Sequence, residues 1–162
     1  DTDDIGAISQ EVVSLGSQAL GHPADDRILI EQMANGLIAE LLVGIQNDRH
    51  FGLVMTIAGG GTLVELMADS ATVLLPAQPQ DLANALSTLK VMKLLSGYRG
   101  RAQADLNELV QTLMKIGAMA LALADTLIDM DINPLWVTEH GSIAVDALIR
   151  LGDIDALPTH LR

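Results

Sequence analysis

The spacing of the apolar residues changes in the middle of the chain, and this change restricts the folds available to it. Before Pro76 and Pro79 many apolar residues alternate with other residues, as Leu41, Val43 and Ile45 do, and alternation places them on one face of a β-strand. After these prolines the apolar residues recur every three or four positions, which predicts helices. Strands and helices in separate stretches of chain are typical of an α+β domain.

The predicted elements follow one another as a helix, several antiparallel strands, two helices and two strands. The first helix is expected over residues 3–20, with Asp3 or Asp4 as its N-cap, and Asp105 is expected to cap the third helix. Residues 46–50 are expected to turn a hairpin. The other expected elements are strands at 27–33, 40–45, 52–57, 63–67 and 71–75, helices at 82–97 and 106–120, and strands at 128–137 and 142–148.

The composition excludes several classes of partner. The chain of 162 residues carries a formal net charge of −12, whereas nucleic acids and anionic membranes bind clustered Lys and Arg. The absence of cysteine excludes disulfides and thiolate metal sites, and it is compatible with a cytoplasmic location. The most apolar run, 109–128, contains Lys115 and Asp125, so we interpret it as a buried helix rather than a membrane span. We therefore expect no nucleic acid and no membrane as partners.

Two short apolar segments near the C-terminus carry side chains that suit a hard metal ion. Asp131 and Asn133 stand two residues apart, so a strand would direct both side chains to the same face. A turn at Gly141 would fold the next strand back and place Asp146 opposite them. Two carboxylates and an amide carbonyl suit Mg²⁺, which leaves other positions for water and phosphate. The alternative is that these residues serve only turn formation and the solubility of an edge strand.

Other candidate residues carry weaker signals. The run of Gly59, Gly60 and Gly61 could bring backbone N–H groups close to a phosphate, but it leads into a strand rather than a helix N-terminus. Glu65 beyond it, and Glu31 at a strand-to-loop junction, would be ordinary exposed residues unless those loops bind a ligand. The four histidines have no neighbours at catalytic spacing and are interpreted as surface residues, so no catalytic residue is assigned within the chain.

Four stretches in order, at 29–48, 51–66, 94–106 and 128–149, resemble one known family. They are similar to the ATP-grasp domain of the ADP-forming acyl-CoA synthetases, the relatives of acetate–CoA ligase and of the succinyl-CoA synthetase β-subunit. The resemblance covers nearly the whole chain. It implies an ATP-grasp-like α+β fold, with a mostly antiparallel sheet and packed helices, in which two lobes hold ATP or ADP together with Mg²⁺.

The resemblance also implies a division of the chain and a set of ligand-binding residues. Residues 1–33 would be the helix and strand that remain of the smaller lobe, and residues 34–162 would be the larger lobe with the metal and nucleotide corner. The implied nucleotide-binding residues are Glu31 and Met33 near the adenine and Gly59, Gly60, Gly61 and Glu65 facing the active site, and the implied metal ligands are Asp131, Asn133 and Asp146.

The implied reaction is acid + CoA + ATP ⇌ acyl-CoA + ADP + phosphate, through an acyl phosphate and a phosphohistidine that lies outside this chain. The family's phosphate-gripping lysine and its histidine segment are not found in these residues, so the chain resembles a fragment and is expected to be inactive alone. Its expected partners are a nucleotide and the CoA-binding domains or subunit of the parent synthetase. A truncated smaller lobe would also favour a homodimer built partly from residues 3–33.

Two alternatives to the synthetase remain open from the sequence. A similar ATP-grasp-like module serves as a regulatory part of protein-lysine acetyltransferase fusions. The sequence is also compatible with a degenerate interaction domain that no longer binds a ligand.

Overall fold

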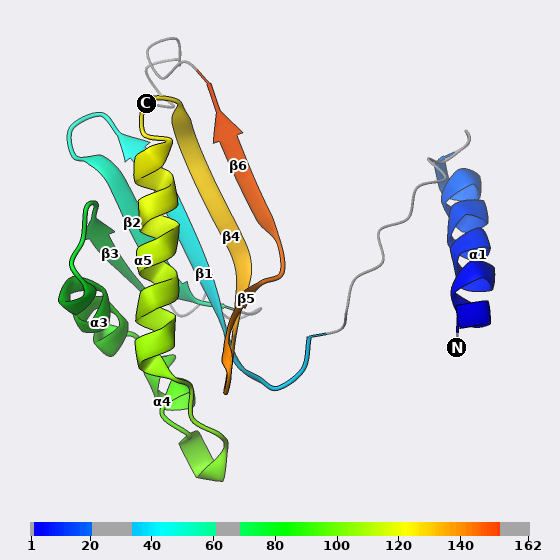
Figure 1. Ribbon diagram of the computed structural model, residues 1–162, viewed down its shortest axis with the longest axis horizontal. Coiled ribbons are helices and arrows are strands. Elements are labelled where there is room, and N and C mark those ends of the chain that lie inside the picture. The colour runs from blue at the N-terminus through cyan, green and yellow to red at the C-terminus, as the bar shows by residue number, and fades with distance from the viewer. Residues whose placement is uncertain (1, 21–33, 61–68, 153–162) are drawn as a thin grey trace. The chain divides into compact units, whose positions relative to one another are not determined.

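The computed structural model describes residues 2–20, 34–60 and 69–152 of the chain. The chain divides into two compact units, Asp1–Met33 and Ala34–Arg162, which Figure 1 draws. The strands expected at 27–33 and 63–67 lie outside the described residues. The assignment of the two units to the two lobes of an ATP-grasp fold stays a prediction.

The described part of the first unit is one helix, α1, which runs Thr2–Leu20 and confirms the helix predicted at 3–20. Asp3 and Asp4 lie inside its first turn, so the prediction that one of them is the N-cap is wrong. No helix in the described part of the chain has the length and apolar character needed to cross a membrane.

The second unit is built on an antiparallel sheet in the order β3-β2-β1-β4-β5, and β6 also pairs with β4. The strands are β1 Leu37–Asp48, β2 Gly52–Gly59, β3 Ser70–Leu74, β4 Leu127–Thr138, β5 Gly141–Ala144 and β6 Ala147–Leu151. The hairpin expected near residues 40–57 is confirmed as β1 and β2, and the strand expected at 71–75 is β3. β1 and β4 are far apart in the sequence but pair along their length. The first and the later strands of this unit therefore meet at the centre of the sheet.

Helices cover one face of the sheet, and Figure 1 shows α3 and α5 on the same side of it. The helices are α3 Pro79–Thr88, α4 Met92–Leu95 and α5 Leu106–Ala122, with a short 3₁₀ turn, η1, at Tyr98–Gly100. Leu41, Val43 and Ile45 of β1 are fully buried, as the alternation predicts, in one core with Leu109 and Leu113 of α5. No helix in the described part of this unit covers the other face of the sheet.

The cap predicted for the third helix is confirmed. Oδ1 of Asp105 accepts hydrogen bonds from the backbone N–H groups of Asn107 (2.9 Å) and Glu108 (3.1 Å), which are free donors at the start of any helix. Asp105 therefore defines where α5 begins.

The single helix predicted over 82–97 is wrong, because the structure has two helices there. Residue Leu89 is extended, with ψ at 141°, and it separates α3 from α4. The carboxylate of Asp69 accepts hydrogen bonds from the backbone N–H groups of Lys90 (2.7 Å) and Val91 (3.1 Å), just before α4. A side chain some twenty positions away in the sequence thus stabilises the break, which the local periodicity does not reveal.

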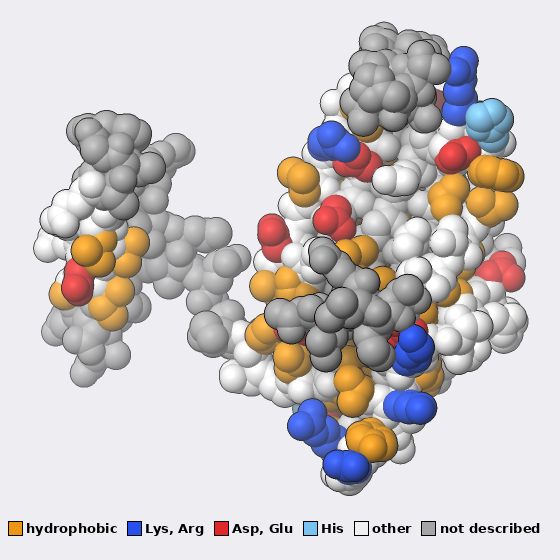
Figure 2. Space-filling view, turned by 180° about the vertical axis from the view of Figure 1, so that it is seen from behind, with side chains coloured by type: hydrophobic (Ala, Val, Ile, Leu, Met, Phe, Trp, Pro, Cys, Tyr) orange, Lys and Arg blue, Asp and Glu red, His pale blue; other side chains and the backbone are white. Residues whose placement is uncertain are grey.

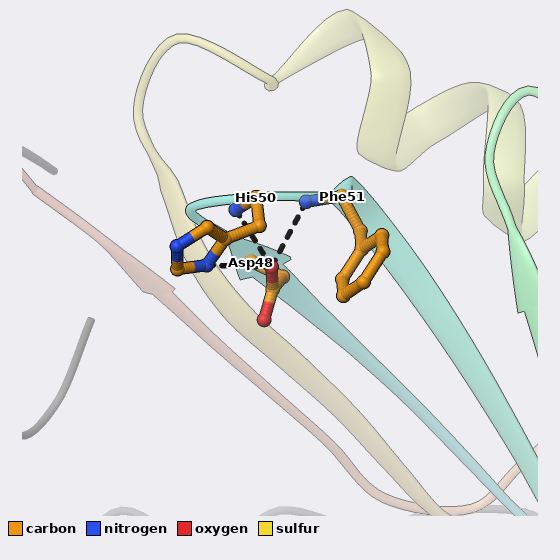
Figure 3. Close-up of polar contacts among 3 residues, drawn as sticks. All are labelled: Asp48, His50 and Phe51. Carbon is orange, nitrogen blue, oxygen red and sulfur yellow. Dashed lines mark hydrogen bonds and ion pairs between the residues drawn. The ribbon is translucent and has the colours of Figure 1, made fainter.

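The turn between β1 and β2 is closed by one carboxylate, as Figure 3 shows. Oδ1 of Asp48 accepts hydrogen bonds from the backbone N–H groups of His50 (2.7 Å) and Phe51 (2.9 Å). These two hydrogen bonds favour the ionised form and lower the pKa of Asp48, and the nearby His50 imidazole acts in the same direction more weakly.

Replacing Asp69 with alanine should lower the free energy of unfolding by about 1–3 kcal/mol, because two backbone N–H groups lose their acceptor. Urea denaturation followed by circular dichroism measures the change. Asp125→Ala is the matched control, since it removes the same charge from an exposed turn after α5. Equal destabilisation by both variants would show that charge, not the break between the helices, is responsible.

The turn at Asp48 should respond to acid. Because its pKa is lowered in the folded state, the contribution of this carboxylate is complete above its ordinary value of 3.8 and is lost as the pH falls through the lower folded value. We expect the NMR amide shifts of His50 and Phe51 to titrate with a midpoint below 3.8. Asp48→Asn should abolish this titration, and a midpoint above 3.8 would contradict the assignment.

Candidate functional site

A β-bulge in β4 shapes the candidate metal corner. Ile132 pairs with Val43, and Leu135 pairs with Leu41, so both Asn133 and Pro134 face one residue of β1. Proline has no N–H to donate, and within a strand that is paired on both edges it is tolerated only at such a bulge. The D-x-N-P sequence therefore sits where the regular ladder of the central sheet is interrupted.

The other edge of β4 is interrupted at the same point. Leu135 pairs with Ala144 of β5, and Ile132 pairs with Ala147 of β6, so the chain between these strands bends beside the bulge. The N–H of Asn133 donates a hydrogen bond to the carbonyl oxygen of Asp146 (3.1 Å). The backbones of Asn133 and Asp146 are therefore in direct contact.

This arrangement corrects one prediction and agrees with another. The last strand expected at 142–148 is two strands, and Asp146 lies in the bend between them rather than on a strand. Asp131 and Asn133 are both exposed while Ile132 between them is 4% exposed, so the two polar residues share one face as their spacing predicts. That face is the one that the described helices leave open.

An ion pair lies next to the corner on the same face of β4. The guanidinium of Arg150 on β6 donates from Nε to Oδ1 of Asp129 (2.8 Å) and from a terminal nitrogen to the other carboxylate oxygen. The side-chain hydrogen bond to Asp129 and the charge of that carboxylate raise the pKa of Arg150. Asp129 is thus compensated. Among the described residues no Lys or Arg lies within ion-pair distance of Asp131 or Asp146.

The donor groups of the corner fit Mg²⁺. Oδ1 of Asp146 accepts a hydrogen bond from the N–H of Ala147 (2.8 Å), which orients this carboxylate. Two carboxylates and one amide are the kind of set from which Mg²⁺ takes one or two ligands while it keeps water and phosphate in the other positions. No group of three Asp, Glu, His or Cys side chains that could hold a metal ion occurs among the described residues, so the corner would depend on the Asn133 amide as well as on two carboxylates.

The glycines at the end of β2 pack tightly inside the fold. The N–H of Gly60 donates a hydrogen bond to the carbonyl oxygen of Glu40, and a Cβ added at Gly60 would lie 2.6 Å from the Cβ of Glu40. The N–H of Gly59 donates to the carbonyl oxygen of Asp69 (3.1 Å). The sequence predicted that the backbone of this glycine run approaches another group closely. At Gly59 and Gly60 that group is the backbone of the protein itself. A contact between these glycines and phosphate stays a prediction.

Four of the predicted nucleotide-binding residues lie outside the described residues. They are Glu31, Met33, Gly61 and Glu65. Their assignment rests on the resemblance alone.

The sequence analysis missed two charged residues on the face of the corner, Asp129 and Arg150. The signal for Asp129 was present, because it stands two positions before Asp131 and a strand places both on one face. Arg150 could not be assigned to Asp129 without knowing that the last strand is broken at Asp146 and resumes in a new register. The missed pair matters because it limits the excess of negative charge beside the corner.

Comparisons with known proteins identify the family of the chain. Residues 5–151 match the family of the ATP-grasp domain. The chain belongs to the ATP-grasp family. Acetate–CoA ligase (ADP-forming) II of Archaeoglobus fulgidus is 31% identical to it over 144 residues, which are 88% of this chain and 21% of that protein. The beta subunit of acetate–CoA ligase (ADP-forming) II of Pyrococcus furiosus is 31% identical over 114 residues, 69% of this chain and 48% of that subunit.

A solved structure agrees with the sequence relatives. Acetyl-coenzyme A synthetase 1 of Ca. Korarchaeum cryptofilum, in complex with coenzyme A and Mg-AMPPCP, superposes with a TM-score of 0.68 at 30% identity. The match covers 74% of this chain and 55% of that one. The ATP-grasp-like α+β fold is therefore confirmed, and the chain spans between a fifth and about half of the length of these relatives.

Replacing Gly60 with alanine should destabilise the second unit by about 1–3 kcal/mol, because the new Cβ would overlap Glu40. Thermal unfolding followed by circular dichroism measures this loss. The control is Gly44→Ala on β1, where the nearest atom to an added Cβ is 3.8 Å away, an ordinary contact. If both variants keep the parent stability, the end of β2 is not packed as described.

Proposed function

We propose that this chain is the ATP-grasp segment of an ADP-forming acid–CoA ligase and that it binds Mg²⁺ with ATP or ADP at the corner of β4. Asp131, Asn133 and Asp146 would be the metal ligands. The observation that carries this proposal is the backbone hydrogen bond from Asn133 to Asp146, which brings the bend between β5 and β6 against the D-x-N motif on the open face of the sheet.

The three residues of the corner would contribute to metal binding in different ways. The carboxylates of Asp131 and Asp146 would supply negative charge to the metal, and the amide oxygen of Asn133 would add a neutral ligand that keeps the total charge low. When bound, Mg²⁺ offsets the charge of the transferring phosphoryl group. The bulge at Pro134 and the hydrogen bond from Ala147 to Asp146 would hold these ligands in position before the nucleotide binds.

The remaining predicted contacts extend this site. Glu31 and Met33 would lie near the adenine, and the glycine-rich run with Glu65 would face the phosphates. The reaction of the whole ligase would be acid + CoA + ATP ⇌ acyl-CoA + ADP + phosphate through a phosphohistidine outside these residues, with the CoA-binding portion as partner and a cytoplasmic location. A homodimer through residues 3–33 remains a separate prediction.

The ligase is favoured over the alternatives drawn from the sequence. The relatives named above are CoA ligases or synthetases and not acetyltransferases. A degenerate domain is disfavoured because the corner keeps the two carboxylates and the amide that the resemblance implies as metal ligands.

Asp131→Asn and Asp146→Asn should each weaken metal binding about tenfold or more, because each removes a ligand charge while keeping the size of the side chain. Asparagine at position 146 can still accept the hydrogen bond from Ala147, so the bend should be preserved. Electron paramagnetic resonance with Mn²⁺ in place of Mg²⁺ measures the site directly, and calorimetry with Mg-ADP measures the nucleotide.

Asp125→Asn is the control for the loss of one exposed carboxylate. It should leave the Mn²⁺ affinity within twofold of the parent. If the three variants bind Mn²⁺ alike, the corner is not the metal site, and the proposed function loses its support.

A further inference from the structure

Four of the nine basic residues of this acidic chain lie in one segment that has no acidic residue. Residues 82–104 contain Lys90, Lys93, Arg99 and Arg101 and not one Asp or Glu. The whole chain carries a net charge of −12, so the residues outside this segment carry −16. Such an asymmetry makes this part of the chain the least unfavourable for an anionic partner.

The segment ends in a loop whose backbone is unusual. Gly97 and Gly100 have φ angles of +85° and +76°, and Arg99 between them has φ at +54°, a value that non-glycine residues rarely adopt. The loop is tied back to the end of α4, because Nε2 of Gln103 donates to the carbonyl oxygen of Ser96 (3.1 Å). Left-handed backbone held in this way presents a side chain in a defined direction and is often found at binding surfaces.

Five of the exposed residues of this segment form what we call the basic tip: Lys93, Leu94, Tyr98, Arg99 and Arg101. Leu94 is 38% exposed and Tyr98 is 47% exposed, and the guanidinium of Arg99 lies over the Tyr98 ring at 5.2 Å from its centre. No Asp or Glu in the described ranges lies within ion-pair distance of Lys93, Arg99 or Arg101. The three cations are therefore available to a partner.

The shape of the basic tip decides between classes of partner. Figure 1 shows that α4 and the loop after it extend past the sheet, and Figure 2 shows Lys and Arg side chains beside hydrophobic ones at this protruding end of the larger unit. A small polyphosphate is normally held in a concave site. A nucleic acid binds many Lys and Arg side chains along an extended surface, whereas the basic tip has three cations. An acidic polypeptide can receive a protruding tip, and Tyr and Arg are the residues that contribute most to protein interfaces.

We infer that the basic tip is a docking surface for an acidic segment of a partner polypeptide. Lys93, Arg99 and Arg101 would pair with its carboxylates, and Tyr98 and Leu94 would contact apolar groups between them. The inference does not rest on the proposed nucleotide site, because the basic tip and the corner of β4 share no residue.

The test uses the 162-residue chain and poly-L-glutamate of about twenty residues as the probe, at low ionic strength, where charge pairing is weakly screened. The double variant Arg99→Gln/Arg101→Gln should weaken binding about tenfold or more in surface plasmon resonance. Arg49→Gln/Lys115→Gln is the matched control, because it removes two exposed positive charges elsewhere and should change the affinity less than twofold.

Two further experiments distinguish an acidic polypeptide from a phosphate polymer as the partner. Inorganic polyphosphate and single-stranded DNA of similar length should bind more weakly than poly-L-glutamate, and Tyr98→Ala should weaken the glutamate complex but not change binding of polyphosphate. Preference for either phosphate probe, or an equal loss in the tip and control variants, would overturn the inference. Far-ultraviolet circular dichroism of each variant establishes that the fold is retained.

Discussion

Burial of one face of the central strand β1 is the constraint on which the second unit depends. Leu41, Val43 and Ile45 are completely buried, and each such side chain contributes roughly 1.5–3 kcal/mol when it leaves water. A slip of one residue in the pairing of β1 would expose all three and direct the polar side chains of Glu40 and Gln46 to the core. The register of β1 with β2 and β4 is therefore fixed by the core, and so is the identity of the residues on the open face.

The same constraint explains why the candidate metal corner has an irregular backbone. Ile132 and Leu135 are both buried although they are three residues apart, and strict alternation cannot place both of them on one face. The extra residue of the bulge restores Leu135 to the core and leaves Asn133 on the open face. The break between β5 and β6 follows on the neighbouring edge, so the position of Asp146 depends on packing beneath the sheet as well as on the turn at Gly141.

Local patterns predicted the parts of the fold that local forces determine. The hairpin follows from alternation in β1, and the start of α5 follows from a cap that involves only residues 105–108. The break between α3 and α4 depends on Asp69, and no periodicity within 82–97 encodes that contact. In the candidate site, the shared face of Asp131 and Asn133 was predictable from their spacing. The bend that holds Asp146 was not, because its cause lies on another strand.

The distribution of charge is compatible with the proposed binding of an anionic nucleotide by a strongly acidic chain. On the open face Asp129 is compensated by Arg150, so the carboxylates of the corner without an ion-pair partner among the described residues are Asp131 and Asp146. A divalent cation bound there would neutralise these two carboxylates, and the phosphates would then meet a metal ion rather than bare negative charge. In the proposed site, the nucleotide would therefore bind only together with the cation. The net charge of −12 does not argue against this, because screening by salt confines the relevant field to the groups within about 10 Å of the phosphates.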